Sequence, residues 1–483
     1  MKVLRGKLLL LLPYITFFVV GIFLLFEPIL DGDEIWNYNF ARNICEGRLP
    51  YVDFNMIQTP LAAYLAAGVL KVFGNTLFHF RIVAIILLAL VFSSLYRLCE
   101  KIIKERTTAF VITVFVYGLN LIFWNYNYNN LNLLLLIWIL CLEWKRYEDE
   151  NESCVLYDVL IGLLVGITPL IKQSTGAVLL VVNIILCISD IICEKSKWKR
   201  KFVRVGISII PLFIFAGILV IQNSFEEFWD YAIAGIGEFT HKITYFEFLF
   251  STPVTFLIGI FPVITIGVCI YSMIRNKEKR RLTGTCLLWA LGGAVVAYPL
   301  CDSTHMVVAI VPFVPCIFLN CKMKKWKSYE TYLCQAVAWT VLLVSALSVF
   351  EAEGEYKKCE LDYFRGIQIE KAMEEHIREV TDYMVKQDEN GQRVAVADEY
   401  GALYTIPLNQ CNKNLDMLLL GNLGTYDVSE ILDEYEDYIL LVRKDNATLG
   451  YQANVDLILS VKESYKKIDE VSSFDAYIRK KEN

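Results

Sequence analysis

A series of long apolar runs is the feature that most constrains what this chain can fold into. A membrane crossing needs about 20 apolar residues in a helix, and 56% of the 483 residues are hydrophobic while only 20% are charged. The runs lie at 8–30, 78–98, 108–123, 131–144, 155–170, 176–192, 203–221, 253–274, 282–300, 306–319 and 332–350. The sequence therefore predicts an α-helical polytopic membrane protein with about 11 transmembrane helices.

The distribution of Lys and Arg predicts how these helices are oriented. If the N-terminus is cytoplasmic, the inner connections hold 24 Lys and Arg residues and the outer connections before residue 350 hold only six. Positive residues are retained on the cytoplasmic side during insertion. We therefore expect a cytoplasmic N-terminus, an odd number of crossings and an extracellular C-terminal region. The short inner loops favour a bacterial plasma membrane, and the net charge of -6 implies no nucleic-acid partner.

The apolar runs also predict the domain organisation. Residues 1–350 are expected to form the transmembrane domain, with long outer loops at 31–77 and 222–251. Within the first loop, residues 59–74 have the apolar helical pattern of a helix that lies in the membrane interface. Residues 351–483 are more charged and predict a small extracytoplasmic α/β domain.

The pattern of that C-terminal domain is specific enough to place its elements. A helix is expected over 351–388, followed by strands at 393–398, 416–420, 438–444 and 474–480. Four cysteines fall on the predicted outer side, and no spacing among them selects a disulfide. They are Cys45, Cys301, Cys359 and Cys411.

Asp33 and Glu34 are the sharpest chemical signal, because they directly follow the first apolar run. Carboxylates are costly beside hydrocarbon, and they usually mark a site there. Adjacent side chains on a helix point about 100° apart. One acid could therefore act as a general base while the other binds a cation or orients the loop. The alternative is an ordinary solvated loop, and we favour the catalytic interpretation.

Polar side chains also follow later apolar runs. Lys172 and the adjacent Gln173 end one run, and the Lys could either reach into water or offer its charge to a lipid-linked phosphate. His305, three residues after Asp302, could donate to a phosphate or cap a turn. Other polar loop side chains, which more often satisfy their own loop, are His241, Lys242 and the Asn-rich stretch 125–130.

Three segments resemble the GT-C class of polytopic glycosyltransferases, and most closely its bacterial protein-O-mannosyltransferase and aminoarabinose-transferase-like group. They are residues 32–74, 162–176 and 298–312. The resemblance implies a hexosyl- or pentosyltransferase in the bilayer. Such an enzyme transfers sugar, with inversion, from a polyprenyl-phosphate-linked donor to a cell-envelope acceptor that is a glycan, lipid or protein. One position departs from the pattern, because Leu300 stands where many relatives have Arg.

The same resemblance implies roles for individual residues. Asp33 falls on the family's catalytic base, and Glu34 lies beside it. The remaining candidates would contact donor or acceptor, and they are Arg42, Gln58, Lys172, Gln173, Asp302 and His305. No cofactor is required by this chemistry, no metal ligand set is predicted, and a divalent cation stays open.

Two other functions remain as alternatives. A membrane transporter or lipid-linked glycan flippase would also need many spans, but no internal repeat occurs, and the middle of most spans lacks Asp, Glu, Lys and Arg, unlike many transporters. A receptor or assembly protein would use the outer α/β domain to bind a partner. Substrate flux without sugar transfer would favour the first alternative, and loss of function on deleting 351–483 alone would favour the second.

Overall fold

The computed structural model describes most of the chain, and it describes residues 2–12 by their backbone only. The described residues are 2–29, 32–148, 155–194, 198–235, 242–320, 335–337, 339–340, 354–419, 421–450 and 453–480. They form two compact units, which we call the helical unit and the mixed unit. The helical unit is Met1–Leu24, Ala84–Ile218 and Lys242–Glu351, and the mixed unit is Leu25–Val83, Leu219–His241 and Ala352–Asn483. These two units are defined by contacts between residues and not by a membrane. The transmembrane boundary at residue 350 therefore stays a prediction.

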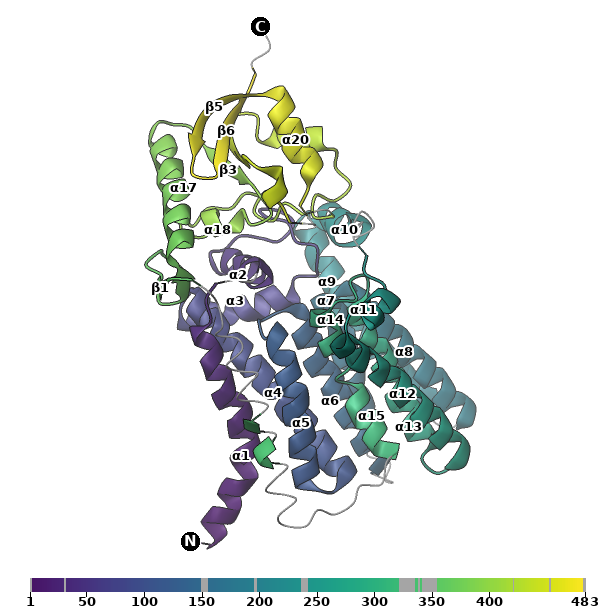
Figure 1. The fold of residues 1–483 in the computed structure, drawn as a ribbon. Helices are drawn as coiled ribbons and strands as arrows, with labels where there is room; N and C mark the ends of the chain where they lie inside the picture. The colour runs from purple at the N-terminus through teal and green to yellow at the C-terminus, as the bar shows by residue number, and fades with distance from the viewer. Residues whose placement is uncertain are drawn as a thin grey trace. The chain divides into compact units, whose positions relative to one another are not determined.

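The helical unit follows the apolar runs closely (Figure 1). Ten of the eleven runs coincide with helices, and the eleventh, at 332–350, lies mostly outside the described residues. The helices are α1 (Lys2–Phe23), α4 (Leu77–Ile103, which begins in the mixed unit), α5 (Arg106–Asn120), α6 (Tyr128–Glu148), α7 (Val155–Ile171), α8 (Gln173–Cys193), α9 (Trp198–Ile221), α11 (Tyr245–Ser251), α12 (Pro253–Arg275), α13 (Arg280–Ala294), α14 (Ser303–Ala309) and α15 (Phe313–Asn320).

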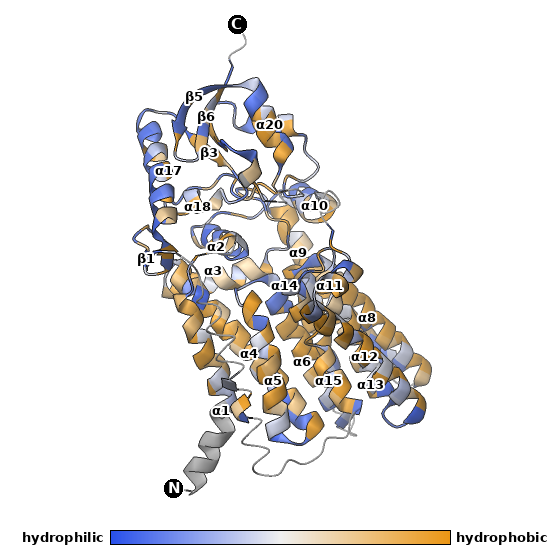
Figure 2. Cartoon of the chain, viewed as in Figure 1, coloured by the Kyte–Doolittle hydropathy of each residue, from blue (hydrophilic) through white to orange (hydrophobic). Residues whose placement is uncertain are grey.

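Several of these helices are suited to a bilayer. Within the described residues, five are long and apolar enough to cross a membrane, and the pair α14 and α15, bent by 42°, would make a sixth. Apolar colour dominates α4, α5 and α12 in Figure 2. On α9, Phe213 is 75% exposed, as expected for a side chain that faces lipid. The chain is a multi-pass membrane protein, and the count of 11 crossings stays a prediction.

Close helix packing in this unit depends on small residues. A Cβ atom on Gly162 would lie 2.5 Å from the backbone oxygen of Arg204, and one on Gly166 would lie 2.5 Å from that of Ser208. These glycines, four residues apart on α7, let its backbone approach α9 directly. The approach brings charged side chains of neighbouring helices together.

A buried ion network joins α6, α7, α8 and α9, and we call it the ion network. Lys201 Nζ lies 2.7 Å from Asp158 Oδ1 and 3.0 Å from Asp190 Oδ2. Arg204 lies 2.9 Å from Glu143. The described members are Glu143, Asp158, Asp190, Arg146, Lys201, Arg204 and, nearer the surface, Arg200 and Arg281. Sequence patterns gave no sign of it, because each charge stands near the end of an apolar run and looks like an ordinary loop residue.

The mixed unit combines the first long loop with the C-terminal region. Its central sheet has the strand order β3-β4-β6-β5, in which β3 and β4 are parallel and the other pairs are antiparallel. Its elements are α2 (Gly32–Cys45), α3 (Leu61–Phe73), α10 (Phe225–Trp229), β1 (Tyr356–Lys358), β2 (Gln368–Glu370), α17 (Lys371–Glu389), β3 (Val394–Ala397), α18 (Ala402–Thr405), α19 (Val428–Glu434), β4 (Ile439–Arg443), α20 (Val455–Ser464), β5 (Tyr465–Val471) and β6 (Phe474–Arg479). The predicted helix at 59–74 and strands at 393–398, 438–444 and 474–480 are confirmed.

Two predictions for the C-terminal domain are wrong. In the segment predicted as a strand at 416–420, Asp416 and Met417 end a buried turn and Leu419 makes only an isolated bridge to Ala453, because the Asp416 carboxylate is held by side-chain bonds from Asn39 and Thr405. The predicted helix at 351–388 begins only at Lys371, since β1 and β2 form a two-stranded sheet before it. Strand β5 was missed because most of its side chains are exposed and polar, which is typical of an edge strand.

The cysteines left open by the sequence do not form disulfides. Cys45, Cys301, Cys359 and Cys411 are all free thiols in the structure. Cys359 and Cys301 are buried, so they pack as small apolar residues.

Candidate functional site

The two adjacent acids at the start of α2 have different surroundings. Acidic residues in a first turn stabilise a helix N-terminus, and both Asp33 and Glu34 occupy that turn. Glu34 is 2% exposed, and its carboxylate accepts two bonds of 2.7 Å from the guanidinium of Arg81. Arg81 also donates to the backbone oxygens of Glu27 and Pro28. Glu34 therefore fixes the start of α2, whereas Asp33 stays half-buried.

Arg42 lies in the interior of the mixed unit. Its guanidinium donates to the side chains of Asn39, Asn43 and Asn409 and to the backbone oxygen of Gln410. Burial lowers its pKa from the ordinary value, although the nearby Asp416 carboxylate opposes that shift. These bonds attach α2 to the segment after α18. The guanidinium of Arg42 is thus held by protein groups, and its predicted contact with donor or acceptor stays a prediction.

Gln58 and the start of α2 also contribute to the packing of this unit. Gln58 is buried, and its backbone oxygen accepts a 2.6 Å bond from the Tyr51 hydroxyl. Trp36 stacks on Tyr400 with ring centroids 5.6 Å apart. A Cβ atom on Gly32 would collide with the Tyr400 ring, so only glycine fits before Asp33. The C-terminal region thus holds the helix that carries the two acids.

In the helical unit, Lys172 forms the break between α7 and α8. Its ammonium donates to Asn129 Oδ1 at 3.0 Å and lies 5.0 Å from the centroid of the Tyr128 ring. Gln173 begins α8 and is half-buried. Lys172 is therefore a half-buried cation beside the Asn-rich segment that begins α6.

Buried polar atoms in that segment and on the nearby α8 have no hydrogen-bond partner among the residues that the structure describes, and we call their side chains the amide cluster. Both amide atoms of Asn132 are in this state, as are one atom each of Asn129 and Asn130 and the hydroxyl of Thr175. Leaving such a group unpaired costs roughly 1–3 kcal/mol, so buried orphans mark a place for water or a polar ligand. Sequence reasoning weighed 125–130 mainly as a turn and missed Asn132, whose only signal is its position inside an apolar run.

Asp302 pairs with His305, and the His305 ring contacts the same segment. Asp302 Oδ1 accepts from the His305 backbone N–H at 2.9 Å and lies 2.8 Å from His305 Nδ1. Burial acts to raise the pKa of Asp302, but the hydrogen bonds and charge of His305 outweigh it and hold that pKa below its ordinary value. The His305 ring packs 5.9 Å from Phe123, whose backbone oxygen accepts a bond from Asn130. The structure thus brings Lys172, the amide cluster and His305 together around one segment, 121–132.

An apolar cavity of about 420 Å³ is lined by the residues on either side of the stretch from Asp302 to His305. Cys301 and Met306, which flank Asp302 and His305 in sequence, line it together with Tyr245, Pro262 and Tyr298. Among the described residues that line it, Lys242 carries a positive charge. His241 lies outside the described residues. An apolar space with a cation at its border suits a chain-like lipid that carries an anionic head.

The described residues contain no cluster of three or more His, Cys, Asp or Glu side chains that could hold a metal ion. Asp33 and Glu34 are two acids of one turn, and Glu34 is already paired with Arg81. The role of a divalent cation stays a prediction.

Comparisons with known proteins agree with the fold. Residues 57–221 match the family model described as dolichyl-phosphate-mannose-protein mannosyltransferase. Two crystal structures of ArnT from Cupriavidus metallidurans, one in the apo state and one bound to undecaprenyl phosphate, are each 11% identical in sequence. Each comparison covers 98% of this chain and 98% of ArnT, with a TM-score of 0.57. No curated protein sequence matches the chain significantly.

At 11% identity the likeness to ArnT shows the fold, and the family match adds the class of enzyme. The chain has the GT-C fold with a small C-terminal sheet domain. Together with the family match over 57–221, this fold supports a GT-C membrane glycosyltransferase.

Proposed function

We propose that this protein transfers a sugar from a polyprenyl-phosphate donor to an extracytoplasmic cell-envelope acceptor, with inversion and with Asp33 as general base. The observation that carries the proposal is the convergence of Lys172, the amide cluster and His305 on segment 121–132, beside an apolar cavity. Polar and cationic groups next to an apolar space suit a ligand that has a phosphate and a sugar at one end and a hydrocarbon chain at the other.

The donor side of the proposal follows from charge and polarity. A lipid phosphate needs cationic donors, which Lys172 and Lys242 supply, and the polyprenyl chain needs an apolar space such as the cavity lined by Met306. The unpartnered amide atoms of Asn132 could bind sugar hydroxyls, since an amide both donates and accepts. ArnT has been crystallised with undecaprenyl phosphate, and the matching family model is named for a dolichyl-phosphate sugar.

The base is proposed from the contrast between the two acids. Both carboxylate oxygens of Glu34 accept 2.7 Å bonds from the Arg81 guanidinium, so Glu34 serves to fix the start of α2. Asp33 keeps partial exposure at the end of a helix that the C-terminal region holds in place. An aspartate in that position can remove the acceptor hydroxyl proton while the oxygen attacks the anomeric carbon and the lipid phosphate departs. Attack from the face opposite the leaving group inverts the configuration.

A transfer assay tests this proposal directly. Purified full-length protein is incubated with a panel of radiolabelled undecaprenyl-phosphate sugars and cell-envelope extract, and the label that leaves the lipid is counted. We expect transfer from one donor, and a loss on the order of 10³-fold in Asp33→Asn, because general base catalysis is worth roughly 10²–10⁴-fold.

The matched control is Asp53→Asn, which removes an exposed carboxylate from the same loop. It should transfer at the wild-type rate. Full activity of Asp33→Asn would refute the assigned base, and label that crosses a proteoliposome membrane without ever leaving the lipid would refute the transferase and favour a flippase.

A further inference from the structure

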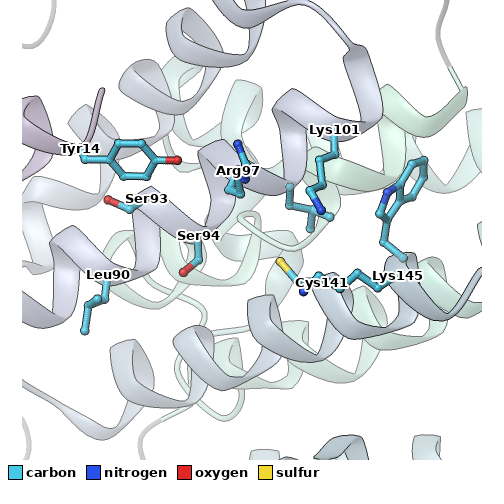
Figure 3. A pocket seen from close by; sticks show the side chains of 10 residues that line it. Tyr14, Leu90, Ser93, Ser94, Arg97, Lys101, Cys141 and Lys145 are labelled. Carbon is cyan, nitrogen blue, oxygen red and sulfur yellow. The ribbon is translucent and has the colours of Figure 1, made fainter. Parts of the chain in front are cut away.

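A second cavity of the helical unit is basic rather than apolar. It has a volume of about 420 Å³, within the range of small-molecule sites, and lies between α1, α4 and α6. Arg97 and Lys101 project from α4, Lys145 and Cys141 from α6, and Tyr14 from α1, around a common space (Figure 3). We call it the basic cavity. None of its lining residues belongs to the site described above.

The charge of the basic cavity is not neutralised by the residues that surround it. Arg97 pairs with Glu100 at 2.9 Å, but Glu100 is shared with Arg106 at 2.8 Å. Lys101 and Lys145 have no ion-pair partner among the residues that the structure describes. Two ammonium groups therefore face one space without a carboxylate between them, which favours an anion there.

The cavity also presents neutral donors. Trp144 lines the cavity and is nine-tenths buried, and its indole N–H has no hydrogen-bond partner within the described part of the chain. An indole nitrogen can only donate. Ser93 adds a hydroxyl on the α4 side. A tetrahedral anion with several acceptor oxygens would satisfy these groups and both lysines at once.

The position of the cavity distinguishes a lipid from a soluble anion. Leu90, at its apolar end, is 45% exposed on the surface of α4. Lys101 lies three turns further along the same helix, about 16 Å away at 1.5 Å per residue. The cavity thus runs from an apolar surface suited to acyl chains to a cationic end suited to a headgroup. Both Lys101 and Lys145 belong to the connections predicted to be cytoplasmic, where anionic lipids bind basic pockets between helices.

We propose that the basic cavity binds the phosphate headgroup of an anionic phospholipid from the leaflet at the Lys- and Arg-rich ends of α4 and α6. The two lysines hold the phosphate, Trp144 donates to one of its oxygens, and the acyl chains lie along α4 past Leu90. This site does not rest on the proposed function, since it involves no donor or acceptor contact.

Lipid titration of the purified full-length protein, followed by native mass spectrometry, tests the proposal. We expect phosphatidylglycerol to bind at least about tenfold more tightly than phosphatidylcholine, because the choline cation of phosphatidylcholine would lie beside two like-charged ammonium groups. The double variant Lys101→Gln and Lys145→Gln should lose that preference. If the double variant does not fold, Lys145→Gln alone, at an exposed position, should reduce the preference severalfold.

The matched control removes the same charge elsewhere. Lys199 and Lys277 are exposed lysines outside the cavity, and their double change to Gln should leave the preference intact. The proposal is overturned if the cavity variant binds phosphatidylglycerol like the wild type, if phosphatidylcholine binds equally well, or if equimolar inorganic phosphate displaces the lipid. The last result would assign the site to a free phosphate.

Discussion

The two ends of α6, α7 and α8 hold different kinds of buried polar group, namely charges that pair with one another at one end and neutral amides at the other. At one end the ion network pairs Asp158 and Asp190 with Lys201. At the other end, Asn132 lies about 16 Å from Glu143 along α6, at 1.5 Å per residue, and both polar atoms of its side chain lack a hydrogen-bond partner among the described residues. Burying a charged group is unfavourable unless the group has an ion-pair or hydrogen-bond partner, so buried charges in native proteins are usually paired. The paired end is therefore expected to hold the fold, and the unpaired end is expected to hold a ligand.

The largest effect should follow from breaking the paired end. Asp158→Asn leaves Lys201, Arg146 and Arg204 buried near an uncharged group. Removing one partner from a buried ion pair costs about 3–5 kcal/mol, so the melting temperature in detergent should fall steeply. Glu148→Gln, at the exposed end of α6, is the control and should melt like the wild type. A stable Asp158→Asn variant would mean that the network is not structural.

A smaller loss is expected in the mixed unit, at the pair of Glu34 and Arg81. Glu34→Gln keeps the shape of the side chain but leaves the buried guanidinium with a neutral partner, and we expect a loss of about 3 kcal/mol in the free energy of unfolding. The double variant with Arg81→Met should recover part of that loss, because no uncompensated charge remains. Denaturation monitored by tryptophan fluorescence measures both. Equal stability of Glu34→Gln and wild type would remove the distinction drawn between the two acids.

The smallest effect on stability is expected at the unpaired end. Asn132→Leu removes two polar atoms that have no partner, so unfolding should change by less than about 1 kcal/mol or become harder. Donor affinity should nevertheless fall severalfold, as measured by the KM for the undecaprenyl-phosphate sugar. If Asn132→Leu destabilises the protein as Asp158→Asn does, the amide cluster is structural and the comparison between the two ends fails.

Much of the fold was accessible from sequence, because hydropathy is a local property. The helices at 78–98 and 176–192 and the strand at 438–444 each form on a continuous apolar run, and the structure confirms them. What escaped prediction depends on partners far away in the chain. Trp36 donates to the backbone oxygen of Glu399, 363 residues later. No local sequence pattern indicates that the first loop packs against the C-terminal region.

The candidate site shows the same division. The position of Asp33 and Glu34 could be recognised from the pattern, but their different surroundings depend on Arg81, which lies 47 residues after Glu34. Lys172 and His305 stood out as polar residues at the ends of apolar runs. Only the packing of the helices shows that both residues contact the same segment, 121–132.

The most direct test compares one lysine at each end of the same helices. Lys172→Gln and Lys201→Gln are each measured for melting temperature and for binding of undecaprenyl phosphate. We predict that Lys172→Gln binds about tenfold more weakly, since a charge-assisted bond to phosphate is lost, while its melting temperature stays within about 2 °C of the wild type. Lys201→Gln should melt much earlier but, below its melting temperature, bind normally. If Lys172→Gln binds undecaprenyl phosphate as tightly as the wild type, the assignment of the unpaired end as the ligand site is wrong.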